Sequence, residues 1–349
     1  MNRILCFLFT AMLCGAAEPT SKNNESLKRI LKRYPAADAN KDGVLTLAEA
    51  KAFQKHRRDR EAKRPVLKPT QVDIAYGTHA RHKLDLWLAE RDGPAPLLIC
   101  IHGGGFRAGD KSQYHRQVNL IKRMHAAGIS VAAINYRYTE GGKNPLPGAM
   151  HDAARAVQFL RHNARRFNLD KTRFAATGGS AGACILMWLG FHDDLADADS
   201  ADPIARESTR IIALAPSGGQ PTISLVTFRE WFGVKNLIPH PAMRAIFGLR
   251  GEGVIEWTPE LAERARISSP ITFLTRDDPP CYQTYGSADT PVTEKTPPNE
   301  WVHHPRLGLK LKAAMDKLGI ECHVQYKGGP PIKSYHGVND FLVKKLTGK

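Results

Sequence analysis

Long hydrophobic runs are scarce in this sequence, and so are cysteines. The longest terminal run, residues 4–13, is shorter than the roughly 20 apolar residues that a helix needs to cross a bilayer, so we expect no transmembrane segment. The 349 residues include six cysteines, two of which lie at or near that run. The other four lie in apolar stretches, which favours buried free thiols over disulfides: Cys100, Cys184, Cys281 and Cys322.

The N-terminal run has the order of features found in a secretory signal peptide. Arg3 provides a positive charge, residues 4–13 are apolar, and residues 15–17 (Gly-Ala-Ala) supply small side chains for cleavage before Glu18. The sequence therefore predicts a signal peptide over residues 1–17 and a secreted or periplasmic protein. The alternative interpretation is a buried terminal helix.

Acidic residues are too few to balance the basic ones, and the formal net charge is +16. Residues 22–68 contain 14 Lys and Arg against six Asp and Glu, so this segment alone carries +8, half of the excess. Such an arm suits nucleic acid, an anionic polymer or an anionic surface, and export argues against nucleic acid. A solvated basic helix is the alternative.

Oxygen donors are dense in residues 38–49. They occupy positions 1, 3, 5, 7, 9 and 12 of that stretch, and a glycine at position 6 permits a sharp turn. This is the spacing of an EF-hand calcium loop, and helical patterns flank it at 25–34 and 47–60. An acidic turn without metal is the alternative. The ligands that the spacing predicts for Ca²⁺ are Asp38, Asn40, Asp42, Val44 (main-chain carbonyl), Thr46 and Glu49.

Only one such loop occurs in the sequence. The segment resembles the single EF-hand, or half-dockerin, near the N-termini of some secreted bacterial hydrolases, which implies a structural or attachment role. We predict an EF-hand-like module over residues 22–64 and a proline-bounded linker over 65–70.

Strand and helix patterns alternate from about residue 71 to the end. A hairpin is expected at 72–76 and 83–88, and buried strands at 96–101, 129–136 and near 173–177. Later strands are expected at 210–215, 280–285 and 322–326. Helices are expected at 114–127, 147–167, 181–191, 307–318 and 338–346. The pattern predicts an α/β fold over 71–349 with a mostly parallel sheet. Residues 217–269 break the alternation and suit a lid or substrate-binding insertion.

Residues 178–182 (Gly-Gly-Ser-Ala-Gly) follow the strand-like run 173–177. A serine between glycines at i−2 and i+2, where a strand turns into a helix, is typical of a nucleophile elbow. The turn leaves no room for flanking side chains and exposes the hydroxyl of Ser180.

Residues 102–106 (His-Gly-Gly-Gly-Phe) directly follow the expected strand at 96–101. Three glycines let backbone N–H groups approach a substrate and stabilise a developing oxyanion. Together the two motifs resemble the esterase/lipase branch of the α/β-hydrolase superfamily, including its hormone-sensitive-lipase-like and feruloyl/acetyl-xylan-esterase-like groups. The resemblance implies an oxyanion hole formed by Gly104, Gly105 and the N–H of Ala181. Gly179 departs from the aspartate common at this position in the lipase-like group and is closer to the polysaccharide-esterase group.

The catalytic histidine should follow the last strand, because the order in this fold is Ser, acid, His. His336 lies there and is the predicted base. His303 and His304 precede the expected helix 307–318, on the wrong side of that strand, and we interpret them as surface or structural residues.

The catalytic acid should lie in the turn after the strand at 280–285. Asp289 occupies that turn and is the predicted acid. Asp277, Asp278 and Glu294 remain alternatives. The interval from Asp289 to His336 is long, with an insertion around residues 290–305.

These features predict a secreted serine carboxylic-ester hydrolase with a Ser180–His336–Asp289 triad, acting on small esters or on acylated polysaccharides. No cofactor is expected for catalysis. The alternatives are a peptidase or amidase on the same fold, and a calcium-dependent binding protein without catalysis.

Overall fold

The computed structural model describes residues 18–249 and 255–349. The predicted signal peptide, residues 1–17, lies outside them. The chain divides into two compact units, one that ends at Val66 and one that spans Leu67–Lys349. The division falls within the predicted linker at 65–70. No helix in the described ranges is long and apolar enough to cross a membrane.

The small unit is a helix–loop–helix. Helix α1 (Glu25–Arg33) is capped by Asn24, whose side chain accepts two backbone N–H groups of the first turn. A short 3-10 turn, η1 (Pro35–Ala37), leads into the loop 38–46, and α2 (Leu47–Ala62) follows. The unit buries a small apolar core of its own: Leu27, Ala37, Leu45 and Ala50.

The large unit is built on an eight-stranded sheet in the order β1-β2-β4-β3-β5-β6-β7-β8. The strands are β1 (Gln71–Ala75), β2 (Lys83–Trp87), β3 (Ala95–Ile101), β4 (Ser130–Ile134), β5 (Leu169–Gly179), β6 (Leu214–Ser217), β7 (Cys281–Thr284) and β8 (Cys322–Gln325). Strand β2 runs antiparallel to β1 and β4, and the other neighbours are parallel. The mostly parallel sheet confirms the predicted fold class.

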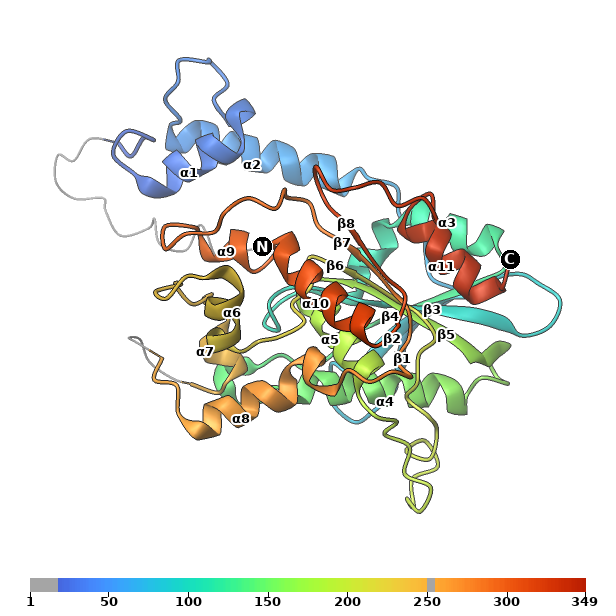
Figure 1. The fold of residues 1–349 in the computed structure, drawn as a ribbon. Coiled ribbons are helices and arrows are strands. Elements are labelled where there is room, and N and C mark those ends of the chain that lie inside the picture. The colour runs from blue at the N-terminus through green and yellow to red at the C-terminus, as the bar shows by residue number, and fades with distance from the viewer. Residues whose placement is uncertain (1–17, 250–254) are drawn as a thin grey trace. The chain divides into compact units, whose positions relative to one another are not determined.

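Helices cover both faces of the sheet (Figure 1). On one face, α4 (Gly148–His162), α5 (Ala181–Phe191) and α10 (Pro305–Lys317) contribute to the larger apolar core. On the other face, α3 (Val118–Ala126) and α11 (Val338–Thr347) form a second core. Every residue of β3 and β4 is buried, as expected of strands covered on both sides.

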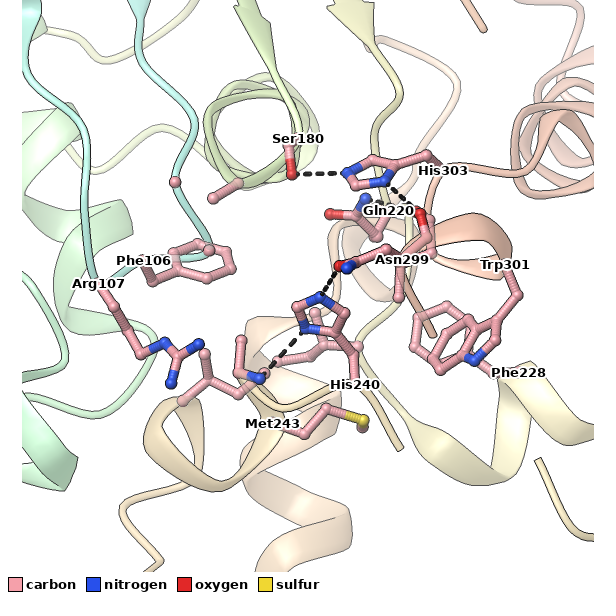
Figure 2. Close-up of a pocket in the computed structure, with 17 residues that line it drawn as sticks. Phe106, Arg107, Ser180, Gln220, Phe228, His240, Met243, Asn299, Trp301 and His303 are labelled. Atoms are coloured by element: carbon pink, nitrogen blue, oxygen red, sulfur yellow. Dashed lines mark hydrogen bonds between the residues drawn. The ribbon is translucent and has the colours of Figure 1, made fainter. Parts of the chain in front are cut away.

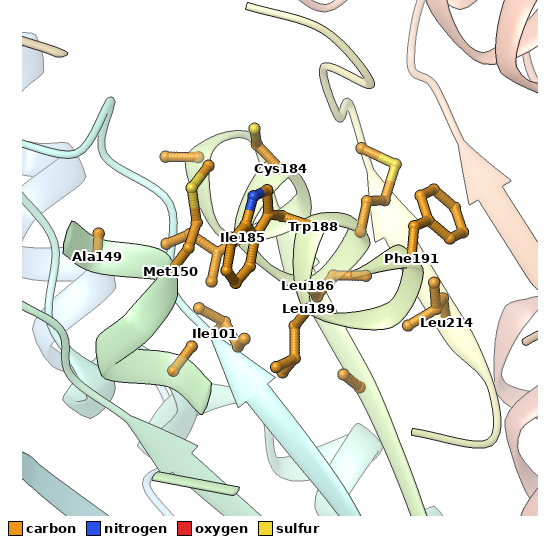
Figure 3. Packing of buried hydrophobic residues seen from close by; sticks show 14 of the residues in the cluster. Ile101, Ala149, Met150, Cys184, Ile185, Leu186, Trp188, Leu189, Phe191 and Leu214 are labelled. Atoms are coloured by element: carbon orange, nitrogen blue, oxygen red, sulfur yellow. The ribbon is translucent and has the colours of Figure 1, made fainter. Parts of the chain in front are cut away.

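Helix α5 lies at the centre of the larger core. All of its 11 residues are buried, and Figure 3 shows its side chains between α4, β3 and β6. Gly190 allows close contact, because a Cβ there would lie 2.5 Å from a methyl group of Leu214. The helix that begins directly after Ser180 is therefore rigidly held, and so is the serine.

Several element boundaries differ from those predicted. The expected helix 114–127 is divided at Gln117 into a 3-10 helix, η2 (Lys111–Arg116), and α3. The expected strand 210–215 begins only at Leu214 and runs to Ser217. A short 3-10 turn, η3 (Glu140–Gly142), precedes α4.

The expected insertion at 217–269 is a set of short helices between β6 and β7. They are α6 (Leu225–Phe232), α7 (Met243–Ile246) and α8 (Pro259–Ser268), followed by η4 (Pro270–Phe273). The side chains of Ser224 and Thr258 cap α6 and α8. A further short helix, α9 (Pro298–Trp301), lies between β7 and α10.

Candidate active site

Ser180 lies at the turn between β5 and α5 with φ 53° and ψ −118°, a strained conformation for a residue with a side chain. The flanking glycines are required by space. A Cβ on Gly178 would lie 2.6 Å from the carbonyl oxygen of Ile101, and one on Gly182 would lie 2.1 Å from it. The turn thus has the geometry of a nucleophile elbow.

Ser180 opens into a pocket of about 300 Å³ (Figure 2). Residues 104–107 and Ala181 line one part of it, and the insertion 217–269 supplies most of the apolar part. The wall includes Phe106, Ile223, Phe228, Met243, Ile246, Trp301 and Val302.

The three predicted oxyanion residues all line this pocket. Gly104 and Gly105 have φ angles of 116° and 59°, and a Cβ on Gly104 would lie 2.0 Å from the carbonyl oxygen of Ala108. Within the described ranges, the N–H groups of Gly104, Gly105 and Ala181 donate no hydrogen bond to the backbone. Unpaired N–H groups beside a serine hydroxyl are what an oxyanion needs.

His102 contacts the first residue of this glycine loop. Its Nδ1–H donates to the carbonyl of Gly103 at 2.8 Å, and Arg81 donates to its Nε2 at 3.2 Å. Its ring stacks on Tyr136 with centroids 4.3 Å apart. Burial is the main cause that lowers the pKa of His102 to about 4, so the ring is neutral at pH 7.

The imidazole beside the serine belongs to His303. Its Nε2 lies 2.9 Å from the Oγ of Ser180, and its Nδ1 lies 2.9 Å from the main-chain oxygen of Asn299. Because a carbonyl only accepts, Nδ1 carries the proton and Nε2 is free to accept from the serine hydroxyl. Gly218 makes room for this ring, since a Cβ there would lie 3.2 Å from Cδ2 of His303.

The structure does not bring His336 to Ser180, which corrects the predicted pairing. His336 is exposed, its backbone N–H binds Asp340 at 3.1 Å, and it does not line the pocket. The segment after β8 leads to α11, which packs with α3 on the other face of the sheet. The insertion between β7 and α10 returns to the pocket instead and carries His303 there.

Asp289 lies apart from His303. Its carboxylate pairs with the guanidinium of Arg306 at 3.2 Å and lies 3.7 Å from Nδ1 of His304, which accepts the backbone N–H of Arg306. His304, interpreted above as structural, is buried and caps α10. The predicted contact between the acid and the catalytic base is therefore absent, and a main-chain carbonyl occupies its place.

The alternative acids also lie outside the pocket. Asp277 is bound by Thr275 and Arg210, and Glu294 is exposed. Asp278 is buried, and desolvation raises its pKa to about 6. No carboxylate lines the pocket in the described part of the chain.

The signal for His303 was the unexpected length of the interval between Asp289 and His336. The insertion in that interval carries Trp301 and Val302 into the pocket wall and His303 to the serine. The position of a histidine relative to the last strand did not identify the partner of Ser180.

The loop 38–49 has the backbone pattern of a turn folded around its side-chain oxygens. Asp38 Oδ2 accepts from the N–H of Gly43 at 2.8 Å, and Asp42 Oδ1 accepts from the N–H of Val44 at 2.7 Å. Thr46 and Glu49 bond reciprocally at the start of α2, as in a capping box.

One oxygen in this loop is available to bind a cation. Asp38 Oδ1 is buried and has no hydrogen-bond partner. In the described ranges no three His, Cys, Asp or Glu side chains gather as a metal cluster. An EF-hand combines carboxylates with amide, hydroxyl and main-chain oxygens, and this loop has all of these.

The segment before α1 forms hydrogen bonds with the end of this loop. Thr20 forms an antiparallel bridge with Thr46, and the N–H of Ser21 donates to the carbonyl of Leu45 at 2.8 Å. The N–H of Leu45 in turn donates to Oγ of Ser21 at 2.9 Å. These bonds pair both the N–H and the carbonyl of Leu45, at position 8 of the loop, with the chain that precedes the loop.

The sheet order, the elbow and the glycine loop together have the arrangement of an α/β-hydrolase fold. The chain belongs to the BD-FAE family, which matches residues 84–297, more than half of its length. The matched range includes Ser180 and Asp289, and it ends before His303 and His336.

Comparisons with single proteins agree with this placement. The probable carboxylic ester hydrolase LipM of Mycobacterium tuberculosis is 28% identical over 232 residues, which are 63% of this chain and 48% of that protein. The chain thus spans about half the length of this relative. A truncated carbohydrate esterase from gut microbiota has a TM-score of 0.56 at 18% identity, covering 76% of this chain and 88% of that one. The acetyl ester-xyloside bifunctional hydrolase of Caldicellulosiruptor lactoaceticus has a TM-score of 0.55 at 20% identity, with the same coverage. These two share the fold.

Proposed function

We propose that this protein is a serine carboxylic-ester hydrolase with Ser180 as nucleophile and His303 as general base. The observation that carries the proposal is the 2.9 Å contact between Ser180 Oγ and His303 Nε2, at the mouth of a pocket lined by Gly104 and Gly105. Geometry of this kind suits acyl transfer, because nucleophile, base and oxyanion donors converge on one point.

The reaction follows from the roles of these groups. His303 takes the hydroxyl proton as Ser180 attacks the ester carbonyl, and the N–H groups of Gly104, Gly105 and Ala181 stabilise the oxyanion. His303 then gives the proton to the departing alcohol, and water hydrolyses the acyl-enzyme by the same steps.

The Ser180–His303 pair differs from a standard triad in the group that contacts Nδ1 of the histidine. The carbonyl of Asn299 holds the Nδ1–H tautomer of His303, but it carries no full negative charge to stabilise the imidazolium. Catalysis here relies on orientation and on the oxyanion donors.

The substrate we propose is a small ester or an acyl group on a polysaccharide. The apolar wall of the pocket suits a short acyl chain, and two proteins of the same fold are named as a carbohydrate esterase and an acetyl ester-xyloside hydrolase. Initial rates with p-nitrophenyl esters and acetylated xylan test this substrate class. Activity on p-nitroanilides alone would favour the amidase or peptidase alternative.

Three alanine variants test the assignment of the residues. Ser180→Ala and His303→Ala should each reduce kcat for p-nitrophenyl acetate by about 10³-fold or more, because the nucleophile and its base act as a unit. His336→Ala is the matched control and should retain activity within about twofold, since His336 is exposed and does not line the pocket. Loss of activity in His336→Ala with full activity in His303→Ala would reverse the assignment. Failure of a fluorophosphonate to label Ser180 would favour a binding protein without catalysis.

We also propose that the loop 38–49 binds Ca²⁺ in a structural role and that residues 1–17 direct export. The buried, unpartnered oxygen of Asp38 supports the first proposal, and the order of charge, apolar run and small residues supports the second. Mass spectrometry of protein recovered from an export-competent host tests the second: an N-terminus at Glu18 is expected, and an intact Met1 would contradict it.

A further inference from the structure

Three hydrogen bonds lead from His240 of the insertion 217–269 to the reactive serine, and a fourth holds His240 within the insertion (Figure 2). The N–H of Ala242 donates to Nδ1 of His240 at 3.1 Å, and Nε2 of His240 lies 2.8 Å from Oδ1 of Asn299. The main-chain oxygen of Asn299 accepts from Nδ1 of His303, whose Nε2 accepts from Ser180. Two residues, Asn299 and His303, thus link His240 to Ser180 through hydrogen bonds.

The contacts fix the tautomer of His240. A backbone N–H only donates, so Nδ1 of His240 accepts from Ala242. Nε2 therefore carries the proton and donates a hydrogen bond to Asn299 Oδ1. Burial is the main cause that lowers the pKa of His240, and the positive charge of Arg107 acts in the same direction, whereas the hydrogen bond to Asn299 opposes them. The neutral ring is therefore the form that holds Asn299 near pH 7.

The segment that presents His303 depends on the insertion for its position. Trp301 donates from Nε1 to the carbonyl of Ile238 at 3.1 Å, and Gln220 donates to the carbonyl of Val302 at 2.6 Å. Helix α9 has only four residues, too few to hold a side chain in place by its own hydrogen bonds. The partner of the His303 ring is itself part of this turn, so a shift of Asn299 redirects the imidazole.

We propose that His240 is a positioning residue, which orients His303 by holding Asn299. The proposal rests on the assignment of Ser180 and His303 as nucleophile and base. The insertion then has a role in the reaction besides shaping the pocket. It holds the turn whose Asn299 carbonyl contacts His303 where a catalytic carboxylate usually does. Displacement of a catalytic group by 1 Å is enough to cost about 10²-fold in rate.

The test compares variants that remove or keep the donor at this position. His240→Leu removes the N–H at similar size and should lower kcat for p-nitrophenyl acetate by about 10- to 100-fold, with KM changed less than about twofold. His240→Gln keeps an N–H at nearly the same reach and should recover most of that loss. The matched control is His162→Ala, an exposed histidine in α4, which should behave as the parent does.

A second variant acts on the partner and guards against misfolding. The side chain of Asn299 is exposed, so Asn299→Ala should fold even if His240→Leu does not, and it should lower kcat to a similar extent. The double variant His240→Leu/Asn299→Ala should be no slower than either single variant, because both remove one interaction.

Several outcomes would overturn the proposal. A parental kcat in His240→Leu or in Asn299→Ala, additive losses in the double variant, or failure of Gln to restore the rate would each remove the positioning role. Undiminished activity in Ser180→Ala would instead overturn the serine mechanism, and with it this proposal. The two failures are distinguishable by that one variant.

Discussion

At the scale of single residues, the site is built by close approach of backbone rather than by a large set of polar side chains. Gly178 and Gly182 let the elbow lie against the carbonyl of Ile101, and Gly218 lets His303 reach the serine. In each place a side chain would occupy space that another group already fills. The catalytic geometry should therefore be sensitive to single methyl groups.

Gly218→Ala should lower kcat by about 10-fold or more while Ser180 remains in place. The added Cβ would lie 3.2 Å from the His303 ring, and the φ of 56° is unfavourable for alanine. Steady-state kinetics with p-nitrophenyl acetate measures the effect. Gly286→Ala is the control, because nothing lies within 4 Å of its added Cβ. Equal kcat values for the two variants would contradict the role of Gly218.

His102 should make stability depend on pH in one direction. Its folded pKa of about 4 lies below the unfolded value of 6.5, so between these values the unfolded chain binds more protons and stability falls as pH falls. The full effect is roughly 3 kcal/mol and is present above pH 6.5. Urea unfolding at pH 7.5, 5.5 and 4.5, compared with His102→Gln, isolates this contribution. The parent should lose stability relative to the variant as pH falls. An equal dependence of the unfolding free energy on pH in both proteins would contradict the lowered pKa of His102.

At the scale of elements, short helices supply most of the apolar wall of the pocket. Phe228 on α6 is buried and packs against Trp301 of α9, with ring centroids 4.9 Å apart. Both rings line the cavity beside Ser180. Under the proposed function, we expect the insertion and α9 to set the length of acyl chain accepted, whereas the strands and the elbow set the chemistry.

Phe228→Ala should shift preference toward longer acyl chains. Removing the ring enlarges the pocket, and each added methylene that fills the space is worth about 1–3 kcal/mol in specificity. The ratio of kcat/KM for p-nitrophenyl hexanoate to that for the acetate should rise by about 10-fold. Val226→Ala, on the exposed side of the same helix, should leave the ratio unchanged. An unchanged ratio in Phe228→Ala would place the acyl chain elsewhere.

At the scale of the whole molecule, the chain consists of two units with separate cores. Among the described residues of the small unit, the core has four buried apolar side chains, which is little for a domain of its size. Binding of Ca²⁺ at the loop would add stability where the apolar core supplies least. Metal should therefore act on this unit and leave the ester hydrolysis of the large unit unchanged.

Calcium at 100 times its Kd should stabilise the small unit by about 2.7 kcal/mol, which circular dichroism detects as a higher unfolding temperature. Glu49→Gln should abolish the shift, because it removes the carboxylate at position 12. Glu25→Gln, in the same unit but outside the loop, should retain it. Rates with p-nitrophenyl acetate should be equal with Ca²⁺ and with EDTA. A parent protein that shows no calcium-dependent shift would refute the metal site.

The sequence alone determined the features that follow from local backbone constraints. The elbow at Ser180, the glycine loop at 102–106 and the oxygen spacing at 38–49 are each readable because a few neighbouring residues dictate one turn. The alternation of buried strands and helices likewise determined the parallel sheet, since each pattern is a property of one short segment.

Only the tertiary structure decided which histidine meets the serine. Ser180 and His303 are 123 residues apart, and their contact depends on how the insertion before α10 returns across the pocket. Asp289 had the expected position in the chain, yet its carboxylate pairs with Arg306. Which side chain contacts the serine across the pocket depends on how several loops pack and pair their charges. The spacing of residues along the chain does not determine that packing.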